Sequence, residues 1–286
     1  MVVIVGETAS GKSALAMEVA KRFNGELICA DSSTIRSGLD VGSAKPSKED
    51  QKQIKHHLLD VAKPDEVFSA AKFKHLAQKA ITNIASKGKL PIMVGGSGLY
   101  VDSVLYDYEF LPAGDQKERE LLSKLNIKDL VSVAKGRKLD VSDIDTANKN
   151  RLIRFIQTNG QLPKRRPLRS NTLIIGLKTD REALNRNIVE RTEAMIELGL
   201  ESEVEQLVEQ FGWQCEGLKA VGYREWEEFF LGKKSLEKTT FEIIKDTKYL
   251  AKKQRTWFRR NKSIHWVTTP VNQADVVDLI TTFLDN

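Results

Sequence analysis

Residues 1–13 of this 286-residue chain read Met1-Val2-Val3-Ile4-Val5-Gly6-Glu7-Thr8-Ala9-Ser10-Gly11-Lys12-Ser13. An apolar run leads into a loop with two glycines, and residues 14–20 continue with apolar side chains at helical spacing. This strand–loop–helix pattern with Gly-x-x-x-x-Gly-Lys-Ser spacing is a phosphate-binding loop. Its backbone N–H groups point at an anion, Lys12 adds a positive charge and the Ser13 hydroxyl can hold Mg²⁺. The loop predicts a site for phosphate or diphosphate, but not the reaction carried out there.

The rest of the chain alternates apolar runs with helical patterns. Residues 27–30, 90–94 and 172–177 read as buried strands, and residues 69–86 as a helix with Ser69 as its N-cap. This alternation predicts an α/β fold with a parallel sheet flanked by helices. Between residues 113 and 170 short charged helices replace the strands, at about 116–125, 127–134 and 145–158. We therefore expect a core formed by residues 1–112 and 171–286, and a small all-α insertion, 113–170, that caps the crevice.

Two features lie at the predicted carboxyl ends of strands, where ligands bind in parallel sheets. Asp31 follows the second strand and is expected in the same crevice as the loop; an Asx turn or a helix N-cap would equally explain an aspartate there. After residues 90–94 the chain continues with Gly95-Gly96-Ser97, whereas a phosphate-loop ATPase usually has a Mg²⁺-holding aspartate at this place. The glycines predict a close backbone approach and count against an ordinary motor ATPase.

Composition limits the possible partners and surroundings. The net charge of +6, from 45 Lys and Arg against 39 Asp and Glu, is compatible with a polyanionic partner. The two cysteines form no Cys-x-x-Cys pair, which disfavours a disulfide framework or a structural metal site. The chain starts directly in a strand and has no apolar stretch of membrane-spanning length. We expect a cytoplasmic protein without a membrane segment or an obligate protein partner, and a monomer by default.

Positive charge is concentrated in the last large predicted helix, residues 236–260, where lysines and arginines alternate with Tyr249, Trp257 and Phe258. Cations interleaved with aromatic rings suit a nucleic-acid backbone and unstacked bases, although solvated lysines around an apolar face would give the same pattern. Arg151 and Arg154 are three residues apart on one predicted helix face, which can also be a merely solvated face. Arg224, after Gly222, is a candidate phosphate clamp.

In this order, and over nearly the whole chain, these motifs resemble the tRNA dimethylallyltransferase (tRNA isopentenyltransferase) family. The segments that carry the resemblance are Gly6–Ser13 with Thr8-Ala9-Ser10, Asp31-Ser32, Gly38–Pro46, Val94–Tyr100, Val221–Glu225 and Ala251–Arg260. The resemblance implies a P-loop NTPase-like core. It also implies transfer of a dimethylallyl group from dimethylallyl diphosphate to the exocyclic N6 amine of the adenosine 3′ of the tRNA anticodon, with release of diphosphate.

The resemblance also implies roles for single residues. The loop Gly6–Ser13, Lys12 and Arg224 would hold the diphosphate, with Mg²⁺ at Ser13. Thr8 would hydrogen-bond the oxygen that bridges carbon and phosphorus, and Asp31 would orient the amine and accept its proton. The tRNA contacts would be Asp31, Ser32, Ser33, Thr34, Ser97, Arg119, Asn150, Arg151, Leu152, Ile153 and Arg154, with the phosphate backbone held at Lys248, Lys252 and Arg255.

The chain departs from the family pattern at four positions. Thr34 and Arg36 stand where a base-contacting Gln and a Tyr are common, Glu7 where proline is usual, and Ser97 where threonine is usual. Three other functions were weighed. An adenylate isopentenyltransferase would not need the extended basic surface, a phosphate-loop kinase would transfer phosphate from ATP, and an RNA-binding protein with a decayed loop would not keep Thr8, Lys12, Ser13, Asp31 and Arg224 together.

Overall fold

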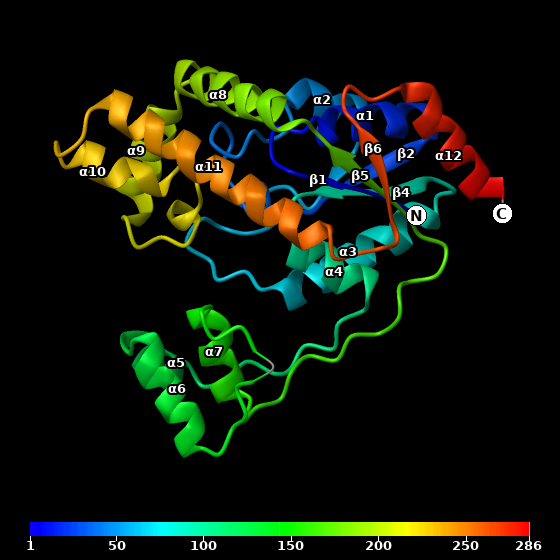
Figure 1. Ribbon diagram of the computed structural model, residues 1–286. Helices are drawn as coiled ribbons and strands as arrows, with labels where there is room; N and C mark the ends of the chain where they lie inside the picture. The colour runs from blue at the N-terminus through cyan, green and yellow to red at the C-terminus, as the bar shows by residue number, and fades with distance from the viewer. Residues whose placement is uncertain (143, 286) are drawn as a thin grey trace. The chain divides into compact units, whose positions relative to one another are not determined.

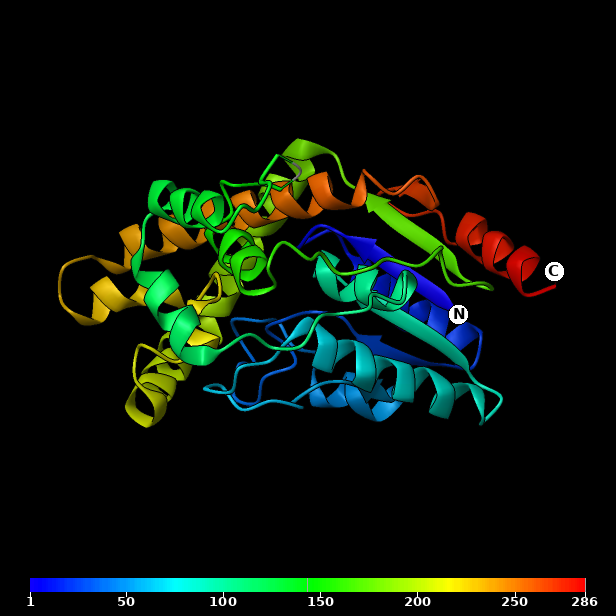
Figure 2. The ribbon, with the colours of Figure 1, turned by 90° about the horizontal axis from the view of Figure 1, so that it is seen from below.

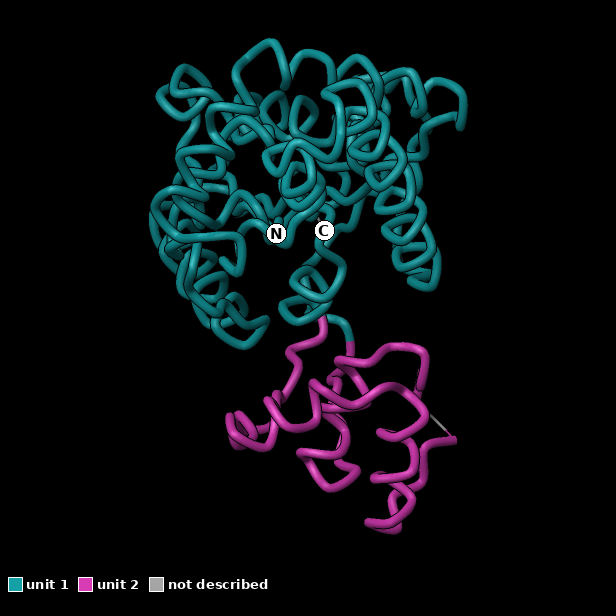
Figure 3. The backbone as a smooth tube through the Cα atoms, turned by 90° about the vertical axis from the view of Figure 1, so that its left-hand side faces the viewer, with its two compact units in different colours: residues 1–105, 168–286 teal, residues 106–167 magenta. Residues whose placement is uncertain are grey.

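The computed structural model describes residues 1–142 and 144–285. It divides into two compact units, which Figure 3 shows in different colours. Unit 1 comprises Met1–Leu105 and Leu168–Asn286, and unit 2 comprises Tyr106–Pro167. None of the helices within these described ranges is long and apolar enough to cross a membrane.

Unit 1 is built on a six-stranded parallel sheet, which confirms the predicted fold class (Figure 1). The strand order is β3-β2-β4-β1-β5-β6, so β1 lies in the interior between β4 and β5. All five residues of β1 are buried, which explains its continuous apolar run. The strands are β1 Val2–Gly6, β2 Gly25–Cys29, β3 His56–His57, β4 Leu90–Gly95, β5 Leu173–Lys178 and β6 Ile264–Thr268.

Helices cover both faces of the sheet (Figures 1 and 2). One hydrophobic cluster joins Val2 and Ile4 of β1 to Leu15 and Val19 of α1 and to Ile280 of α12. Helices α3 and α4 lie on the opposite face. The elements here are α1 Lys12–Arg22, α2 Lys48–Gln53, α3 Ala70–Ala85, α4 Gly98–Leu105 and α12 Gln273–Asp285. Ser69 caps α3 as predicted, because its side chain accepts a hydrogen bond from the Lys72 N–H.

A second group of helices in unit 1 packs beyond the carboxyl ends of the strands. Its core contains Leu200, Val204, Tyr223, Trp226 and Ile243. The elements are α8 Arg181–Glu197, α9 Leu200–Phe211, α10 Glu227–Phe230 and α11 Leu236–Phe258, with short 3-10 turns at Gly217–Lys219 and Arg224–Trp226. Gly199, at φ 92°, separates α8 from α9.

Unit 2 is helical and has its own apolar core, formed around Leu130, Leu152, Ile153 and Ile156. Its helices are α5 Gln116–Lys124, α6 Ile127–Gly136 and α7 Lys149–Gln157. The unit begins at Tyr106 rather than 113 and ends at Pro167 rather than 170, which corrects the expected bounds. The two connecting segments pair with each other: the Glu109 N–H donates to the Lys164 carbonyl, and the Arg166 N–H donates to the Tyr106 carbonyl. This pairing places both segments in unit 2.

Candidate functional site

The phosphate loop has the conformation that its sequence predicts. It leaves β1 at Gly6 and enters α1 at Lys12, with Gly11 as the helix N-cap at φ 86°. No side chain caps this helix end, so its first N–H groups remain available to an anion. Ala9 also has a positive φ, 60°, and its carbonyl accepts a hydrogen bond from Asn187 Nδ2 at 3.1 Å. The loop is therefore held from α8 as well as by its own turn.

A cavity of about 600 Å³ opens beside this loop, at the carboxyl ends of β2 and β4. We call it the donor cavity. Its polar lining includes Thr8, Lys12 and Ser13 from the loop, Asp31 after β2, and Arg191 from α8. Apolar side chains, among them Met17, Leu27 and Val94, cover part of its wall. The cavity therefore combines cations and loop N–H groups for phosphate with an apolar wall for a hydrocarbon group.

Lys12 lies at the bottom of the donor cavity. Its ammonium donates a hydrogen bond to the Glu7 carbonyl at 3.1 Å, which keeps it against the loop. Burial lowers the pKa of Lys12 to about 8, although the nearby Asp31 carboxylate opposes this shift. A bound polyanion would favour the charged form, so Lys12 suits a phosphate-binding role.

A second, narrow cavity of about 60 Å³ lies on the other side of Thr8 and Asp31. We call it the acceptor cavity. It is lined by Ser33, by Val221 and Gly222, and by Thr247 and Gln254 of α11. The two cavities share the residues Thr8, Asp31, Ser43 and Arg191. A group held in the donor cavity can therefore meet a group from the acceptor cavity at Thr8 and Asp31.

Asp31 has both features that its position in the sequence suggested. Its Oδ1 accepts a hydrogen bond from the Ser33 N–H at 2.9 Å, which is an Asx turn, and the residue also lines both cavities. Ser97 Oγ accepts a hydrogen bond from the Ser32 N–H at 3.0 Å. The segment after β2 is thus fixed from the segment after β4, and the Asp31 carboxylate has a defined place at the junction.

Gly95 is required by packing at this sheet edge. A Cβ at Gly95 would lie 2.0 Å from the Ala30 carbonyl oxygen. This close contact is made with Ala30, directly after β2, and Gly95 also lines the donor cavity, where a close approach of the backbone to a ligand stays a prediction.

Arg191 lies at the phosphate site, where we expected Arg224; no sequence motif indicates Arg191. Arg191 lines the donor and acceptor cavities, and burial lowers the pKa of its guanidinium while Asp31 opposes this. Arg224 lines neither cavity; its guanidinium pairs with Glu225, at 3.1 Å, and with Asp246. The role of Arg224 as a phosphate clamp stays a prediction. Two carboxylates hold it in the wall that carries Val221 and Gly222.

Residues Ser43–Pro46 line the donor cavity, and one carboxylate holds the three residues that precede them. Glu203 of α9 accepts hydrogen bonds from the N–H groups of Asp40, Val41 and Gly42, at 2.9, 2.7 and 3.1 Å. It also accepts one from the Tyr223 hydroxyl at 2.7 Å. Gly42 is needed because a Cβ there would lie 2.6 Å from the Tyr223 ring. Sequence spacing gives no sign of Glu203, which acts from more than 160 positions away.

The unusual residues after Asp31 have different surroundings. Thr34 is buried and lines the donor cavity. Arg36 is 8% exposed and donates hydrogen bonds to the carbonyls of Lys63, Pro64 and Glu66, at 2.9, 3.0 and 2.8 Å. Arg36 therefore anchors the segment 63–66 and lies outside the linings of both cavities.

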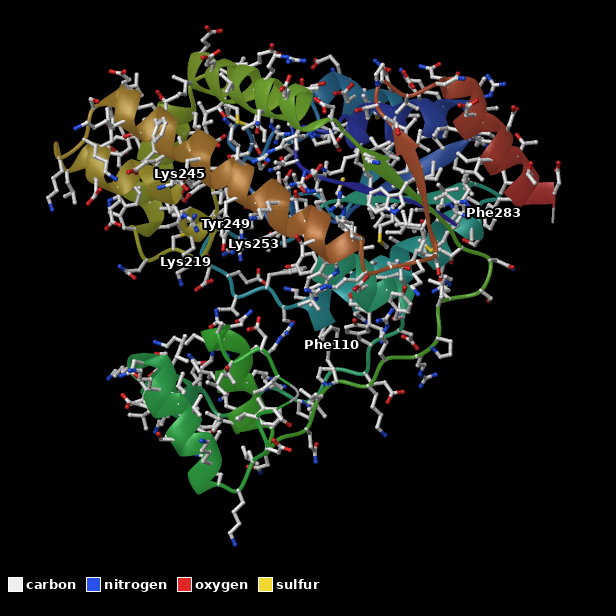
Figure 4. The ribbon with its side chains drawn as sticks, in the orientation of Figure 1. Phe110, Lys219, Lys245, Tyr249, Lys253 and Phe283 are labelled. Carbon is white, nitrogen blue, oxygen red and sulfur yellow. The ribbon has the colours of Figure 1, made fainter. Side chains whose placement is uncertain are left out.

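On α11 the predicted RNA contacts separate into two kinds. Lys252 is exposed and Lys248 half-exposed. Lys245, Tyr249 and Lys253 lie along one side of the same helix (Figure 4). The Lys253 ammonium lies over the Tyr249 ring, 4.3 Å from its centroid. Arg255, in contrast, pairs with the buried Glu7 at 3.3 Å. Arg255 thus pairs with a carboxylate of the phosphate loop itself, and its contact with the RNA backbone stays a prediction.

In unit 2 the segment Asn150–Arg154 likewise contains both exposed residues and residues that are buried or bonded within the protein. Asn150 and Arg151 are exposed, and Arg119 is half-exposed. Leu152 and Ile153 are 0% and 1% exposed in the unit's core, which corrects them as side-chain contacts for RNA. Arg154 Nη2 donates hydrogen bonds to the carbonyls of Leu111, at 2.8 Å, and Pro112. Arg154 therefore holds the connecting segment.

Metal-binding capacity at the site is limited to a few oxygens. In residues 1–142 and 144–285, no group of three or more His, Cys, Asp or Glu side chains is placed to hold a metal ion. Ser13 Oγ lines the donor cavity, as does Asp31. Mg²⁺ commonly takes one or two protein oxygens and completes its shell with water and substrate phosphate. The residues present fit Mg²⁺ bound together with a phosphorylated ligand, and they do not fit an all-protein metal site.

Comparison with known proteins places the chain in a family. A sequence model described as IPP transferase matches residues 35–261. The tRNA dimethylallyltransferase of Acetivibrio thermocellus is 39% identical, over 96% of this chain and 93% of the relative. The enzyme of the same name from Anoxybacillus flavithermus is 38% identical, over 93% of this chain and 89% of the relative.

Solved structures agree. A full-length tRNA isopentenylpyrophosphate transferase from Bacillus halodurans superposes with a TM-score of 0.78 at 32% identity, over 99% of this chain and 96% of that one. A eukaryotic dimethylallyltransferase acting on tRNA superposes with a TM-score of 0.80, over 94% of this chain and 73% of that one; at 22% identity it shows a shared fold. The chain with the junction at Thr8 and Asp31 belongs to the IPP transferase family, together with the tRNA dimethylallyltransferases.

Proposed function

We propose that this enzyme transfers a dimethylallyl group from dimethylallyl diphosphate to the N6 amine of the adenosine 3′ of the anticodon in tRNA. The observation that carries the proposal is the junction: the donor and acceptor cavities share Thr8, Asp31, Ser43 and Arg191. A reaction between a small diphosphate and a base of an RNA molecule needs a separate entrance for each reactant and one place where the two reactants meet. Family membership indicates the class of reaction, and the cavity linings indicate which residues would carry it out.

In this proposal the phosphate loop binds the leaving group. Loop N–H groups, Lys12 and Arg191 stabilise the negative charge that develops on diphosphate as the carbon–oxygen bond breaks. The Thr8 hydroxyl donates to the bridging oxygen of that bond. Mg²⁺, held by Ser13 and phosphate oxygens, would add positive charge at the diphosphate. The apolar wall at Met17, Leu27 and Val94 receives the dimethylallyl group.

Asp31 acts on the other reactant. A carbon–nitrogen bond forms between the prenyl C1 and N6 of adenosine, and the N6 proton passes to the Asp31 carboxylate. General-base assistance of this kind contributes about 10²–10⁴-fold. Because an exocyclic amine is a weak nucleophile, holding the two reactants together at the junction contributes more than the base does.

The base must leave its stack in the anticodon loop to reach the acceptor cavity. Our candidates for holding the RNA backbone are two cations of α11, the half-exposed Lys248 and the exposed Lys252, and two exposed residues of unit 2, Asn150 and Arg151. Base contacts would come from Ser33 and from the Val221–Gly222 segment, which line the acceptor cavity.

The test supplies dimethylallyl diphosphate labelled in its prenyl group together with unmodified tRNA, with AMP or with ATP. The proposal predicts label in tRNA, release of one diphosphate per transfer and no label in AMP. Label in AMP but not in tRNA would identify a free-nucleotide prenyltransferase. Phosphate transfer from ATP would identify a kinase, and either result contradicts the proposal.

A further inference from the structure

The last turns of α11 contact the phosphate loop and helix α4, which follows β4. Arg255 pairs with Glu7, and the Trp257 indole N–H donates to Asp102 of α4 at 3.0 Å. A Cβ at Gly98 would lie 2.4 Å from the Trp257 ring, so α11 and the start of α4 are in close contact. Gln254 directly precedes Arg255 on the same helix, and no sequence motif indicates a role for its side chain.

Gln254 is bonded directly to the phosphate loop. Its Oε1 accepts a hydrogen bond from the Thr8 backbone N–H at 2.8 Å. On the other side, a Cβ at Gly96 would lie 2.3 Å from Gln254 Nε2, so the amide is enclosed between the two loops. The residue is 8% exposed and lines the acceptor cavity. It is therefore oriented by contacts on both sides.

The Gln254 contact fixes Thr8, whose hydroxyl donates to the bridging oxygen of the donor in the proposed reaction. Thr8 has one hydroxyl and a β-branched side chain with few χ1 choices, so a fixed backbone largely fixes the position of Oγ1. The loop carbonyl next to it, that of Ala9, is held separately by Asn187. Gln254 of α11 thus holds the Glu7–Thr8 peptide group and Asn187 of α8 holds the Ala9–Ser10 peptide group, on either side of the Thr8–Ala9 peptide.

We propose that Gln254 is a positioning residue for prenyl transfer, which holds the Thr8 backbone so that its hydroxyl meets the bridging oxygen of the donor. The proposal rests on the proposed function. Gln254 acts through Thr8 and does not itself contact diphosphate. Because α11 also carries the exposed lysines, the helix that we expect to bind RNA also sets the geometry of the leaving-group loop.

The experiment compares wild type with Gln254→Met, which keeps the length but cannot accept the bond, and Gln254→Glu, which keeps an acceptor oxygen. Thr240→Ala is the control on the same helix, because Thr240 is half-exposed, lines neither cavity and donates its hydroxyl hydrogen bond to the Leu236 carbonyl. Thr8→Ala and the Thr8→Ala/Gln254→Met pair complete a double-mutant cycle. The measurements are kcat, KM for dimethylallyl diphosphate, Kd for tRNA and the melting temperature.

We expect Gln254→Met to lower kcat by about 10- to 100-fold, the effect of a buried N–H left without its partner. KM for the donor and Kd for tRNA should stay within about threefold. Gln254→Glu should recover at least part of the rate, and the double variant should be no slower than Thr8→Ala alone.

A fully additive double variant would overturn the proposal, because Gln254 would then not act through Thr8. So would an unchanged kcat in Gln254→Met, or a Gln254→Glu variant that folds like wild type and is as slow as Gln254→Met. These outcomes differ from failure of the proposed function, in which wild type itself transfers no prenyl group to tRNA.

Discussion

At the scale of single residues, the site is a small set of polar groups arranged around one meeting point. Thr8 and Asp31 stand where the two cavities join, Lys12 lies below the loop and Arg191 reaches the junction from α8. In the proposed reaction Thr8 contacts the leaving group and Asp31 accepts the proton. Lys12 and Arg191 stabilise the negative charge of diphosphate. Their effects on turnover and binding should therefore be separable.

Replacement of Asp31 tests the proton-acceptor role. Asp31→Ala should lower kcat by about 10²–10⁴-fold, because the N6 proton loses its acceptor. Kd for tRNA should remain within a few-fold, since most of the RNA affinity comes from phosphate contacts. Filter binding and single-turnover transfer measure the two quantities. Near-wild-type turnover would remove Asp31 from the reaction.

Lys12 predicts how donor binding depends on pH. Its pKa is lowered to about 8, so the cation is present below pH 8 and is lost as the pH rises above it. We expect kcat/KM for the donor to fall about tenfold per pH unit above that point, because this ratio reports groups of the free enzyme. Lys12→Arg, whose side chain stays charged, should remove this fall even if its activity is lower. A flat wild-type profile between pH 7 and 9.5 would contradict the assignment.

At the scale of elements, loops of the site are held by side chains from distant helices. Glu203 of α9 binds three consecutive N–H groups just before the donor-cavity lining, and α11 holds the phosphate loop through Gln254 and Arg255. Irregular backbone at a ligand site needs such partners, because its N–H groups are not used in strands or helices. Rigid elements thereby fix the loops before substrate arrives.

The wall segment gives a direct test of this support. Glu203→Ala removes the acceptor for Asp40, Val41 and Gly42, so we expect KM for dimethylallyl diphosphate to rise by about tenfold and the protein to lose about 1–3 kcal/mol of unfolding free energy. Glu205→Ala, an exposed neighbour on the same helix, is the matched control. Equal donor KM values for the two variants would show that the wall does not depend on Glu203.

Two cations on α11 should behave differently although they are three residues apart. Lys252→Ala should weaken tRNA binding and reduce the salt slope of log Kd by about 1, without a change in stability. Arg255→Ala leaves the Glu7 carboxylate buried and unpaired, so it should lower stability by about 1–3 kcal/mol. Glu7→Gln in the Arg255→Ala background should restore most of this loss. A loss of salt slope in Arg255→Ala equal to that in Lys252→Ala would mean that Arg255 is an RNA contact after all.

At the scale of the whole molecule, the chain is two compact units with separate cores. The ends of unit 2 are adjacent, because the Arg166 N–H donates to the Tyr106 carbonyl and the Arg169 N–H to the Leu105 carbonyl. The residues of both cavities belong to unit 1. The donor site and part of the RNA contacts that we propose thus belong to different units.

Removal of unit 2 should separate these two functions. Replacing residues 107–166 with a short Gly-Ser linker joins backbone ends that already lie side by side, so unit 1 should fold and bind dimethylallyl diphosphate. Transfer to tRNA should be lost, together with at least tenfold of tRNA affinity. Calorimetry and filter binding provide the readouts. Unchanged tRNA affinity would show that unit 2 carries none of the RNA contacts that we assign to it.

The sequence predicts those parts of the site that are local in the chain. The phosphate loop and Asp31 were identifiable because motif spacing and strand ends determine their surroundings. Arg191, Glu203 and Gln254 were not, because each contacts partners more than 140 positions away and stands in an ordinary helical pattern. For a related reason a charge run does not show that Asp246 lies opposite Arg224 or that Glu7 lies opposite Arg255.

The measurement that tests the account most directly is the location of the transferred group. Unmodified tRNA is incubated with the enzyme and labelled dimethylallyl diphosphate, digested with a base-specific nuclease and sequenced by mass spectrometry. We predict one dimethylallyl group per tRNA, on N6 of the adenosine 3′ of the anticodon, in wild type, and none with Thr8→Ala/Asp31→Ala. A modified nucleoside elsewhere in the tRNA, or undiminished modification by the double variant, would contradict the account.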